Sequence, residues 1–295
     1  MSDGKQLKVI VTGAAGQLGS ALCASAPSFM QVCALSRADC DIADAAAIDA
    51  VLDTQGPALL INAAAYTAVD RAEEQSALAF AANADAPGLL SRACAARGIR
   101  FFHVSTDFVF DGLRSSPYPV DAKTAPLGVY GHSKQAGEQA VLDSGADAMI
   151  LRTGWVYSHD GQNFLRTMLR LHAERDEISV VADQVGTPTD AMSLAAALWA
   201  AAERPAIKGI YHFSDAGVCS WYDFALAIGE EAHALGLLDK IAKVTPIRTR
   251  DYPTPARRPS YSVLDKTLTW QDFELAPMHW RGQLRAVLRR LAVRT

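Results

Sequence analysis

A glycine-rich turn near the start of the chain limits the possible fold more than any other stretch. Residues 7–11 predict a short buried strand and residues 20–26 a helix; between them lie Gly13, Gly16 and Gly19. In this context the first glycine permits a tight turn, the second lets a pyrophosphate approach the backbone, and the third lets helix and strand pack closely. Gln17 and Leu18 lie where free N–H groups at the helix N-terminus favour an anion. The alternative is a glycine-rich connection that binds nothing.

Strand and helix patterns alternate along the rest of the chain. Further strands are predicted at residues 31–35, 58–61, 101–104, 148–151 and 209–213, and helices at 43–52, 77–97, 127–142, 162–172, 191–202 and 221–234. This order is typical of an α/β fold with a Rossmann-like, doubly wound parallel sheet. No linker or repeat divides the chain. We therefore expect an NAD(P)-binding lobe over residues 1–149, into which later segments cross back, and a smaller substrate-binding lobe over residues 150–295.

The ends of the second and third strands carry the residues that select the cofactor. An acidic residue directly after the second strand would bind the ribose 2′-hydroxyl of NAD, but Ser36 and Arg37 stand there instead. They suit a 2′-phosphate and favour NADPH, with NADH possible; alternatively, Arg37 faces solvent. After the third strand come Ala63, Ala64, Ala65 and Tyr66, and these small residues let a cofactor lie against the backbone.

Two further groups of residues point to proton transfer. Thr106, Asp107 and Phe108 follow the fourth strand, at the ligand-binding edge of such a sheet, where Thr106 is placed to hydrogen-bond a substrate oxygen. Tyr130 and Lys134 are spaced to share one face of a helix. We expect the lysine charge to lower the pKa of the phenol from its usual value of ~10. The alternative is a solvated helix face.

Composition excludes several classes of protein. The net charge is only -4 and 20% of residues are charged, so we expect neither a nucleic acid nor a membrane as partner. Five scattered cysteines without a Cys-x-x-Cys pair indicate reduced thiols, and the histidine spacing gives no metal site. Residues 1–6 lack the apolar core of a signal peptide. We expect a cytoplasmic protein, and we interpret the basic tail at residues 285–294 as a solvated helix face.

Six motifs occur in order along the chain. The motifs are Thr12-Gly-Ala-Ala-Gly-Gln-Leu-Gly19, Ser105-Thr-Asp-Phe-Val-Phe-Asp-Gly112, Pro126-Leu-Gly-Val-Tyr-Gly-His-Ser-Lys134, Gly137-Glu138, Arg152-Thr-Gly-Trp-Val-Tyr157 and Asp183-Gln-Val-Gly-Thr-Pro-Thr189. As a set they resemble the dTDP-4-dehydrorhamnose reductase family, a branch of the extended short-chain dehydrogenases/reductases, and the resemblance covers almost the whole chain.

The resemblance implies a reaction. Members of the family reduce the 4-keto group of dTDP-4-dehydro-6-deoxy-L-mannose to give dTDP-L-rhamnose, a nucleotide sugar for polysaccharide biosynthesis. A hydride leaves the nicotinamide, and Tyr130 would then protonate the developing alkoxide. Lys134 would bind the nicotinamide ribose, and Thr106 would hydrogen-bond the reacting oxygen.

The resemblance also implies further site residues. Asp41 and Ile42 would lie against the adenine, Asn83 would support the active site, and Trp155 and Gln184 would contact the sugar nucleotide. Arg257 or Arg258 could pair with the substrate diphosphate, since guanidinium is a bidentate phosphate ligand; a surface arginine is the alternative. Some relatives are associated with a homodimer and Mg²⁺, but no ligand cluster in this sequence supports the metal.

Departures from the family pattern discriminate between reactions. The family usually has Tyr where this chain has Phe108, and often Thr where it has Ser133. Related sugar-nucleotide dehydratases carry Glu at the position of Phe108, so the base for elimination is missing here. Open alternatives are a reductase or an epimerase of another 4-keto sugar nucleotide, and a non-catalytic NADP-binding subunit like the regulatory β subunit of methionine adenosyltransferase.

Overall fold

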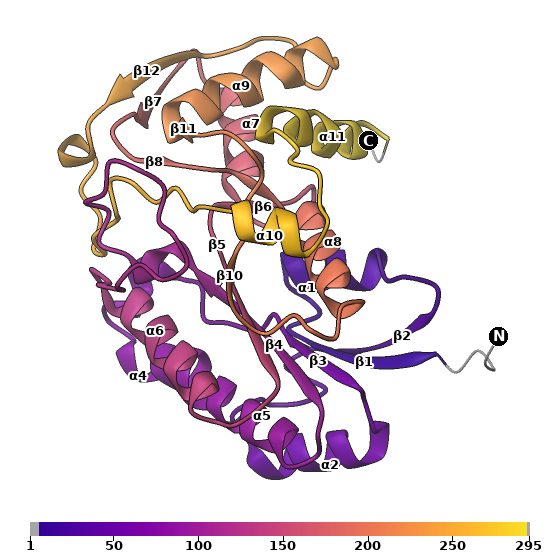
Figure 1. Cartoon of the computed structure of the whole chain (residues 1–295). Helices are drawn as coiled ribbons and strands as arrows, with labels where there is room; N and C mark the ends of the chain where they lie inside the picture. Colours follow the sequence, from indigo (N-terminus) through magenta and orange to yellow (C-terminus); the bar gives the residue numbers. More distant parts are fainter. Residues whose placement is uncertain (1–5, 294–295) are drawn as a thin grey trace.

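A parallel sheet forms the centre of the larger lobe (Figure 1). The computed structural model describes residues 6–293. Residues 1–5 of the N-terminal segment and Arg294 of the basic tail therefore lie outside the described residues. The strands are ordered β10-β5-β4-β3-β1-β2, and every neighbouring pair is parallel. Their bounds are β1 Leu7–Thr12, β2 Met30–Leu35, β3 Leu59–Asn62, β4 Arg100–Thr106, β5 Ala148–Thr153 and β10 Gly209–His212. The predicted doubly wound sheet is confirmed, with its switch point between β1 and β3.

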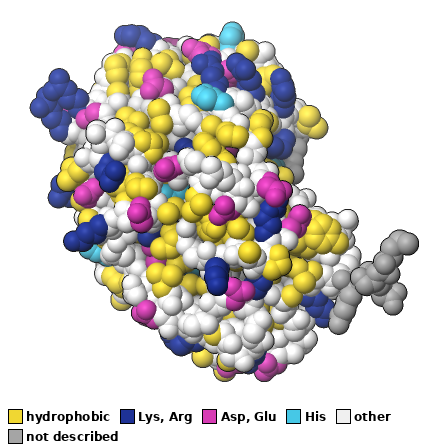
Figure 2. Space-filling model, viewed as in Figure 1, with side chains coloured by type: hydrophobic (Ala, Val, Ile, Leu, Met, Phe, Trp, Pro, Cys, Tyr) yellow, Lys and Arg dark blue, Asp and Glu magenta, His cyan; other side chains and the backbone are white. Residues whose placement is uncertain are grey.

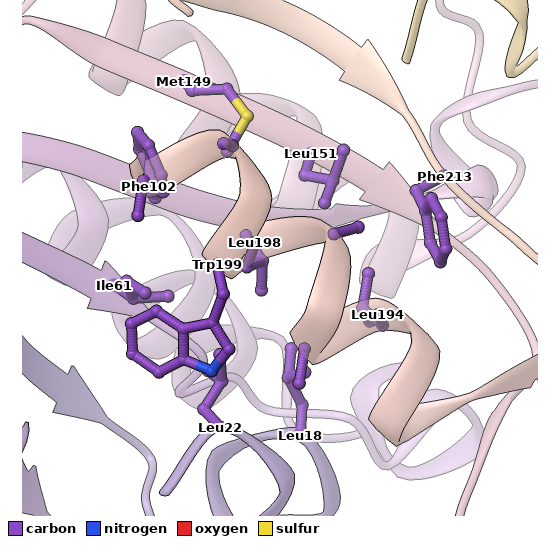
Figure 3. Packing of buried hydrophobic residues seen from close by; sticks show 14 of the residues in the cluster. Leu18, Leu22, Ile61, Phe102, Met149, Leu151, Leu194, Leu198, Trp199 and Phe213 are labelled. Atoms are coloured by element: carbon purple, nitrogen blue, oxygen red, sulfur yellow. The ribbon is translucent and has the colours of Figure 1, made fainter. Parts of the chain in front are cut away.

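Helices cover both faces of this sheet. On one face lie α1 (Gln17–Ala24) and α8 (Ala191–Ala202); on the other lie α2 (Ala45–Gln55), α5 (Ala86–Ala95) and α6 (Val129–Leu142). Helix α8 is alanine-rich and mostly buried, which lets it pack closely against α1 on the same face of the sheet. Figure 3 shows Leu194, Leu198 and Trp199 of α8 pointing toward apolar side chains of α1 and the central strands. Burial of this apolar area is the main stabilisation of the lobe.

The predicted helix over residues 77–97 contains a π turn. Helix α4 (Ser76–Phe80) continues through η1 (Ala81–Asp85) into α5 without leaving the helical path. The extra residue presents Asn83 to α6, where a Cβ on Gly137 would lie only 2.0 Å from the Asn83 carbonyl oxygen. π turns of this kind are frequent at functional sites. Glycine at position 137 is therefore what allows α6 to pack this closely against η1.

The smaller lobe has its own apolar core. Its helices α7 (Phe164–Glu174), α9 (Trp221–Ala234) and α11 (Trp280–Ala292) pack around β7 (Glu177–Val181) and β12 (Lys243–Ile247), which pair in parallel.

The short elements of the chain are α3 Val69–Ala72, η2 Asp107–Val109, β6 Val156–Tyr157, β8 Val185–Gly186, β9 Thr189–Asp190, β11 Cys219–Ser220, η3 Thr249–Asp251 and α10 Thr267–Asp272.

The structure bears on two of the sequence interpretations. The boundary drawn between residues 149 and 150 falls inside β5, and α8 and β10 are later segments that lie in the larger lobe; the division into two lobes at that point stays a prediction. The tail helix α11 is not simply a solvated face: Arg281 and Arg285 both bind Glu231 of α9, and Arg290 reaches Asp190 at 2.6 Å. Sequence alone gave no reason to pair residues up to 100 positions apart.

A buried ion pair fixes α6 on the sheet. Arg152 of β5 donates to both carboxylate oxygens of Glu138 at 2.9 and 2.7 Å, and Ser105 of β4 donates to the same carboxylate. The side chains of Arg152 and Glu138 are each only 4% exposed. Because both charges are out of water, loss of one partner leaves the other uncompensated.

We expect Glu138→Gln to lower the free energy of unfolding by about 3 kcal/mol, because the Arg152 guanidinium then lacks its counter-ion. Urea denaturation measures the change. The matched control is Lys240→Met, which removes an exposed partner of Asp176 and should cost less than about 1 kcal/mol. Equal stability of Glu138→Gln and the wild type would show that the pair contributes nothing.

Candidate active site

The three glycines of the first turn have different reasons to be there. Gly13 has a positive φ of 70°, and a Cβ on it would lie 2.6 Å from the backbone nitrogen of Ala64. A Cβ on Gly19 would lie 2.2 Å from the Gly13 carbonyl oxygen. Gly16 is exposed, and its nearest neighbour would be the Gly13 oxygen at 3.2 Å. The fold therefore needs Gly13 and Gly19 most strictly, whereas Gly16 keeps the backbone accessible from outside.

Helix α1 begins at Gln17, three residues earlier than predicted. Its N-cap is Gly16, which makes no side-chain cap, and no acidic residue occupies the first turn. The side chain of Leu18 is in the core, so at this position only backbone can face a ligand. Gln17 accepts hydrogen bonds from Ser158 and Asn163, which join α1 to the segment after β6. The uncapped N–H groups of α1 fit a phosphate.

The predicted adenosine-binding residues lie in the loop after β2. Arg37 and Asp41 are exposed, and Ile42 is half-buried against the core. The backbone N–H and hydroxyl of Ser36 both donate to Asp39, at 2.8 and 2.5 Å. Asp39 therefore holds this loop in shape. It lies two residues beyond Arg37, so it is not directly after the strand, where an acidic residue would bind the ribose of NAD.

The segment after β3 is held by Asn83. The backbone N–H of Tyr66 donates to the Asn83 carboxamide oxygen at 2.8 Å, and the Asn83 amide donates to the Tyr66 carbonyl and to Ser133. Ala63 and Ala64 lie directly over Gly13. Asn83 therefore connects the π turn, the residue 63–66 segment and α6, and its support of an active site stays a prediction.

Thr106 and Phe108 lie beside Tyr130. The Phe108 and Tyr130 rings meet edge-on with centroids 5.5 Å apart. Thr106 donates to Asp107 at 3.1 Å and accepts the N–H of Phe108 at 3.2 Å, and its hydroxyl is near enough to the Tyr130 phenol to lower the phenol's pKa. The end of β4 and the first turn of α6 thus bring together the predicted proton donor and the residue predicted to hold the substrate oxygen.

The expectation that Lys134 lowers the pKa of Tyr130 is wrong for this arrangement. Burial raises the pKa of Tyr130 to about 12; the hydrogen bond with Thr106 opposes this shift, and the nearby Asp107 carboxylate adds to it. Lys134 instead donates to the Val104 carbonyl at 2.7 Å and lies 3.2 Å from Nε2 of His103. Burial lowers the pKa of Lys134 to about 8, against the raising effect of Glu138.

Sequence reasoning missed the residues behind Lys134. Asn62 of β3 and His103 of β4 are fully buried, and they link Thr12 of β1 to Lys134. The available signal was a polar residue inside each of two otherwise apolar strands. Such groups must find hydrogen-bond partners when buried, and here they find each other.

Glu73 is another residue that sequence reasoning missed. Its carboxylate accepts the backbone N–H of Val129 at 2.9 Å, at the first turn of α6. The N-cap of α6 is Gly128, which provides no side-chain cap. Glu73 therefore replaces a local cap and is placed favourably for the helix dipole, directly beside Tyr130. The 56 positions that separate it from Val129 left no local signal.

Asp107 and Trp155 lie at the ends of β4 and β5. Asp107 is 2% exposed, burial raises its pKa to about 6, and its Oδ2 has no hydrogen-bond partner within residues 6–293. A Cβ on Gly154 would lie 2.5 Å from that oxygen. Trp155 has a φ of 52°, and its ring stacks on Trp221 with centroids 3.5 Å apart. Trp221 was not singled out from the sequence.

The other two predicted substrate residues make contacts within the protein. Gln184 is buried and donates to Thr249 at 3.1 Å. Arg258 forms a two-pronged pair with Asp70, with N–O distances of 3.0 and 2.8 Å, and this bond lowers the pKa of Asp70. Arg257 is exposed. The contacts of Gln184 and Arg258 fix loops at the edge of the site, and their substrate roles stay predictions.

Two other kinds of site are absent from residues 6–293. No group of three or more His, Cys, Asp or Glu side chains is placed to hold a metal ion there. In the same range, no helix is long and apolar enough to cross a membrane. Figure 2 shows acidic and basic side chains interspersed over much of the face it presents.

Comparison with known proteins places this geometry in a family. A family model described as RmlD substrate binding domain matches residues 7–293. A dTDP-4-dehydrorhamnose reductase of Burkholderia thailandensis is 42% identical over 285 residues, covering 93% of this chain and 96% of the relative.

Solved structures agree with these sequence matches. The crystal structure of a dTDP-4-dehydrorhamnose reductase from Clostridium acetobutylicum has a TM-score of 0.91 and 35% identity, covering 97% of this chain and 100% of that one. A Bacillus anthracis dTDP-4-dehydrorhamnose reductase in complex with NADP has a TM-score of 0.90 and 34% identity, covering 98% and 100%. From these matches together with the site geometry, this chain belongs to the dTDP-4-dehydrorhamnose reductase family.

Proposed function

We propose that this protein is an NADPH-dependent reductase that converts dTDP-4-dehydro-6-deoxy-L-mannose to dTDP-L-rhamnose. The observation that carries the proposal is the placement of the Tyr130 ring against Phe108, two residues from Thr106, at the carboxyl edge of the sheet. The relatives are named for this reaction, and one of them was solved with NADP.

The glycine turn fits a dinucleotide. The uncapped N-terminus of α1 would hold the pyrophosphate, the exposed Gly16 would let it approach, and Ala63 to Tyr66 would lie along the cofactor. Arg37 would bind the 2′-phosphate, and Asp41 and Ile42 would lie near the adenine. NADPH, when bound, supplies the hydride for the keto carbon.

The side chains of the site would handle the proton. Because the pKa of Tyr130 is raised to about 12, its phenol is protonated at neutral pH, as a proton donor must be. Tyr130 would give this proton to the oxygen that becomes the alcohol. Thr106 would hydrogen-bond the same oxygen and stabilise its developing charge. Lys134, one turn along α6, would hold the ribose hydroxyls.

The remaining proposed contacts belong to the sugar nucleotide. Asp107 and Phe108 lie beside Thr106, and Trp155 presents an aromatic ring suited to the apolar side of a deoxysugar. Gln184 and one of the two adjacent arginines would contact the nucleotide portion. A homodimer is part of the proposal, and bound Mg²⁺ has no ligand set to support it among residues 6–293. The five cysteines are free thiols, which favours a cytoplasmic location.

Tyr130→Phe should lower kcat at least about 100-fold, because the proton donor is lost while the ring against Phe108 is kept. NADPH consumption with dTDP-4-dehydrorhamnose measures the rate, and NADPH binding should be unchanged. Tyr211→Phe is the control, since its hydroxyl binds Asp272 away from the site. Wild-type rates from Tyr130→Phe would refute the assignment, and no turnover by the wild type would favour a regulatory subunit.

Arg37→Ala should raise KM for NADPH about tenfold and leave KM for NADH unchanged, because only NADPH carries the phosphate that the guanidinium would bind. Steady-state kinetics with both cofactors measure this, and NADH is the internal control. A wild-type enzyme that uses NADH much more efficiently than NADPH would contradict the preference.

Arg257→Ala and Arg258→Ala should separate a phosphate contact from a structural one. Loss of a contact with the diphosphate raises substrate KM about tenfold without changing NADPH binding. Arg258→Ala should also lower the melting temperature, because Asp70 loses its partner. Substrate KM values unchanged in both variants would remove the diphosphate assignment.

A further inference from the structure

A buried chain of hydrogen bonds ends on Lys134. Thr12 Oγ1 donates to Asn62 Oδ1 at 2.7 Å, Asn62 Nδ2 lies 3.1 Å from His103 Nδ1, and His103 Nε2 lies 3.2 Å from Lys134 Nζ. The four side chains come from β1, β3, β4 and α6. Thr12 and Lys134 are 1% exposed, and Asn62 and His103 are 0% exposed. The chain therefore does not lead to solvent, and its role is not proton conduction.

The orientation of the Asn62 carboxamide is fixed by a backbone group. The N–H of Ala64 donates to Asn62 Oδ1 at 3.2 Å, and a backbone N–H has no acceptor function. If the amide were turned over, its NH₂ group would face that N–H. Asn62 Nδ2, which is only a donor, must therefore point at His103 Nδ1.

The proton of His103 follows from this orientation. A donor at Nδ1 requires Nδ1 to be the unprotonated nitrogen, so the neutral imidazole carries its proton on Nε2. That N–H faces Lys134 Nζ. An ammonium group has only donors and would oppose it, whereas a neutral amine accepts the hydrogen and still donates to the Val104 carbonyl.

We propose that His103 is a positioning residue for the reaction: Asn62 holds its proton on Nε2, and this N–H favours the neutral amine of Lys134. Charge supports the same assignment, because burial and the nearby Lys134 hold the pKa of His103 well below its usual value. Burial also lowers the pKa of Lys134 to about 8. Lys134 therefore titrates much closer to neutral pH than an ordinary lysine does.

The consequence for catalysis rests on the proposed function. Each turnover takes a proton from the Tyr130 phenol, and this proton must be replaced before the next one. A lysine with a lowered pKa releases its proton more readily than an ordinary lysine does. By stabilising the amine that remains, the His103 N–H makes this release easier.

Other charged or titratable groups near Lys134 are unchanged by the variants proposed below. Glu138 and Tyr130 lie one turn away along α6, Arg152 of β5 pairs with Glu138, and Asp107 acts on Tyr130. Asn62→Asp adds a carboxylate to this set, so the tautomer of His103 and the pKa of Lys134 have to be measured together.

Asn62→Asp tests the proposal because it keeps the shape and replaces the donor with an acceptor. Nδ1 of His103 should then carry the proton, Nε2 should accept from the ammonium, and the pKa of Lys134 should rise by at least about one unit. Thr12→Val is the matched control, since the Ala64 N–H still orients Asn62. It should leave both the tautomer and the pKa of Lys134 unchanged.

Two measurements read out the result. Long-range ¹H–¹⁵N spectra report the tautomer of His103, assigned with His103→Gln, and ε-¹³C-lysine titration reports the pKa of Lys134, assigned with Lys134→Met. A proton on Nδ1 in the wild type would overturn the proposal. So would a raised lysine pKa in Asn62→Asp with the proton still on Nε2, because that result would be a purely Coulombic effect.

The pH profile of kcat tests the catalytic part. Its lysine-dependent limb should move up in Asn62→Asp by the same amount as the titration, and should not move in Thr12→Val. A limb that stays in place while the lysine pKa moves would overturn the positioning role. If the wild type reduces no 4-keto sugar nucleotide, the proposed function fails, whereas the tautomer and titration results still decide the hydrogen-bond network.

Discussion

The packing of α6 against the end of β4 is the constraint on which the site depends. The buried Glu138–Arg152 pair, the hydrogen bond from Ser105, and the Lys134 ammonium or amine on the Val104 carbonyl all join these two elements or the strand beside them. Glu73 fixes the first turn of the same helix, and Gly137 lets it approach the π turn. The relative position of Tyr130 and Thr106 follows from these contacts, which are mostly made away from the reacting groups.

Burial determines the pKa values of Tyr130 and Lys134 in the site. A lysine charge beside the phenol would have lowered the pKa of Tyr130; instead the pKa of Tyr130 is raised and that of Lys134 is lowered. Desolvation disfavours the charged form of both groups, and at this depth it outweighs the attraction that helix spacing alone suggested. The phenol therefore keeps the proton that a reductase has to deliver.

The two lobes are connected by polar contacts as well as by the sheet. Gln17 binds Ser158 and Asn163, Arg258 binds Asp70, and Arg290 binds Asp190. Several of these contacts use residues that look exposed or ligand-binding when read one at a time. The same guanidinium can fix a loop or bind a phosphate, and its partner in the folded chain is what distinguishes these uses.

The sequence by itself determined that the fold contains a parallel sheet and how strands and helices alternate along the chain. It also determined the glycine turn and the placement of Tyr130 and Lys134 on one helix face. These features are local: hydrophobic periodicity, turn chemistry and helix spacing are written within a few residues. The tertiary structure decided where the lysine points, which residue caps α6, and that Asn62 and His103 stand behind Lys134. These three features depend on contacts between side chains that are far apart in the sequence. Burial at those contacts sets the protonation of the groups, and no local sequence pattern encodes such contacts.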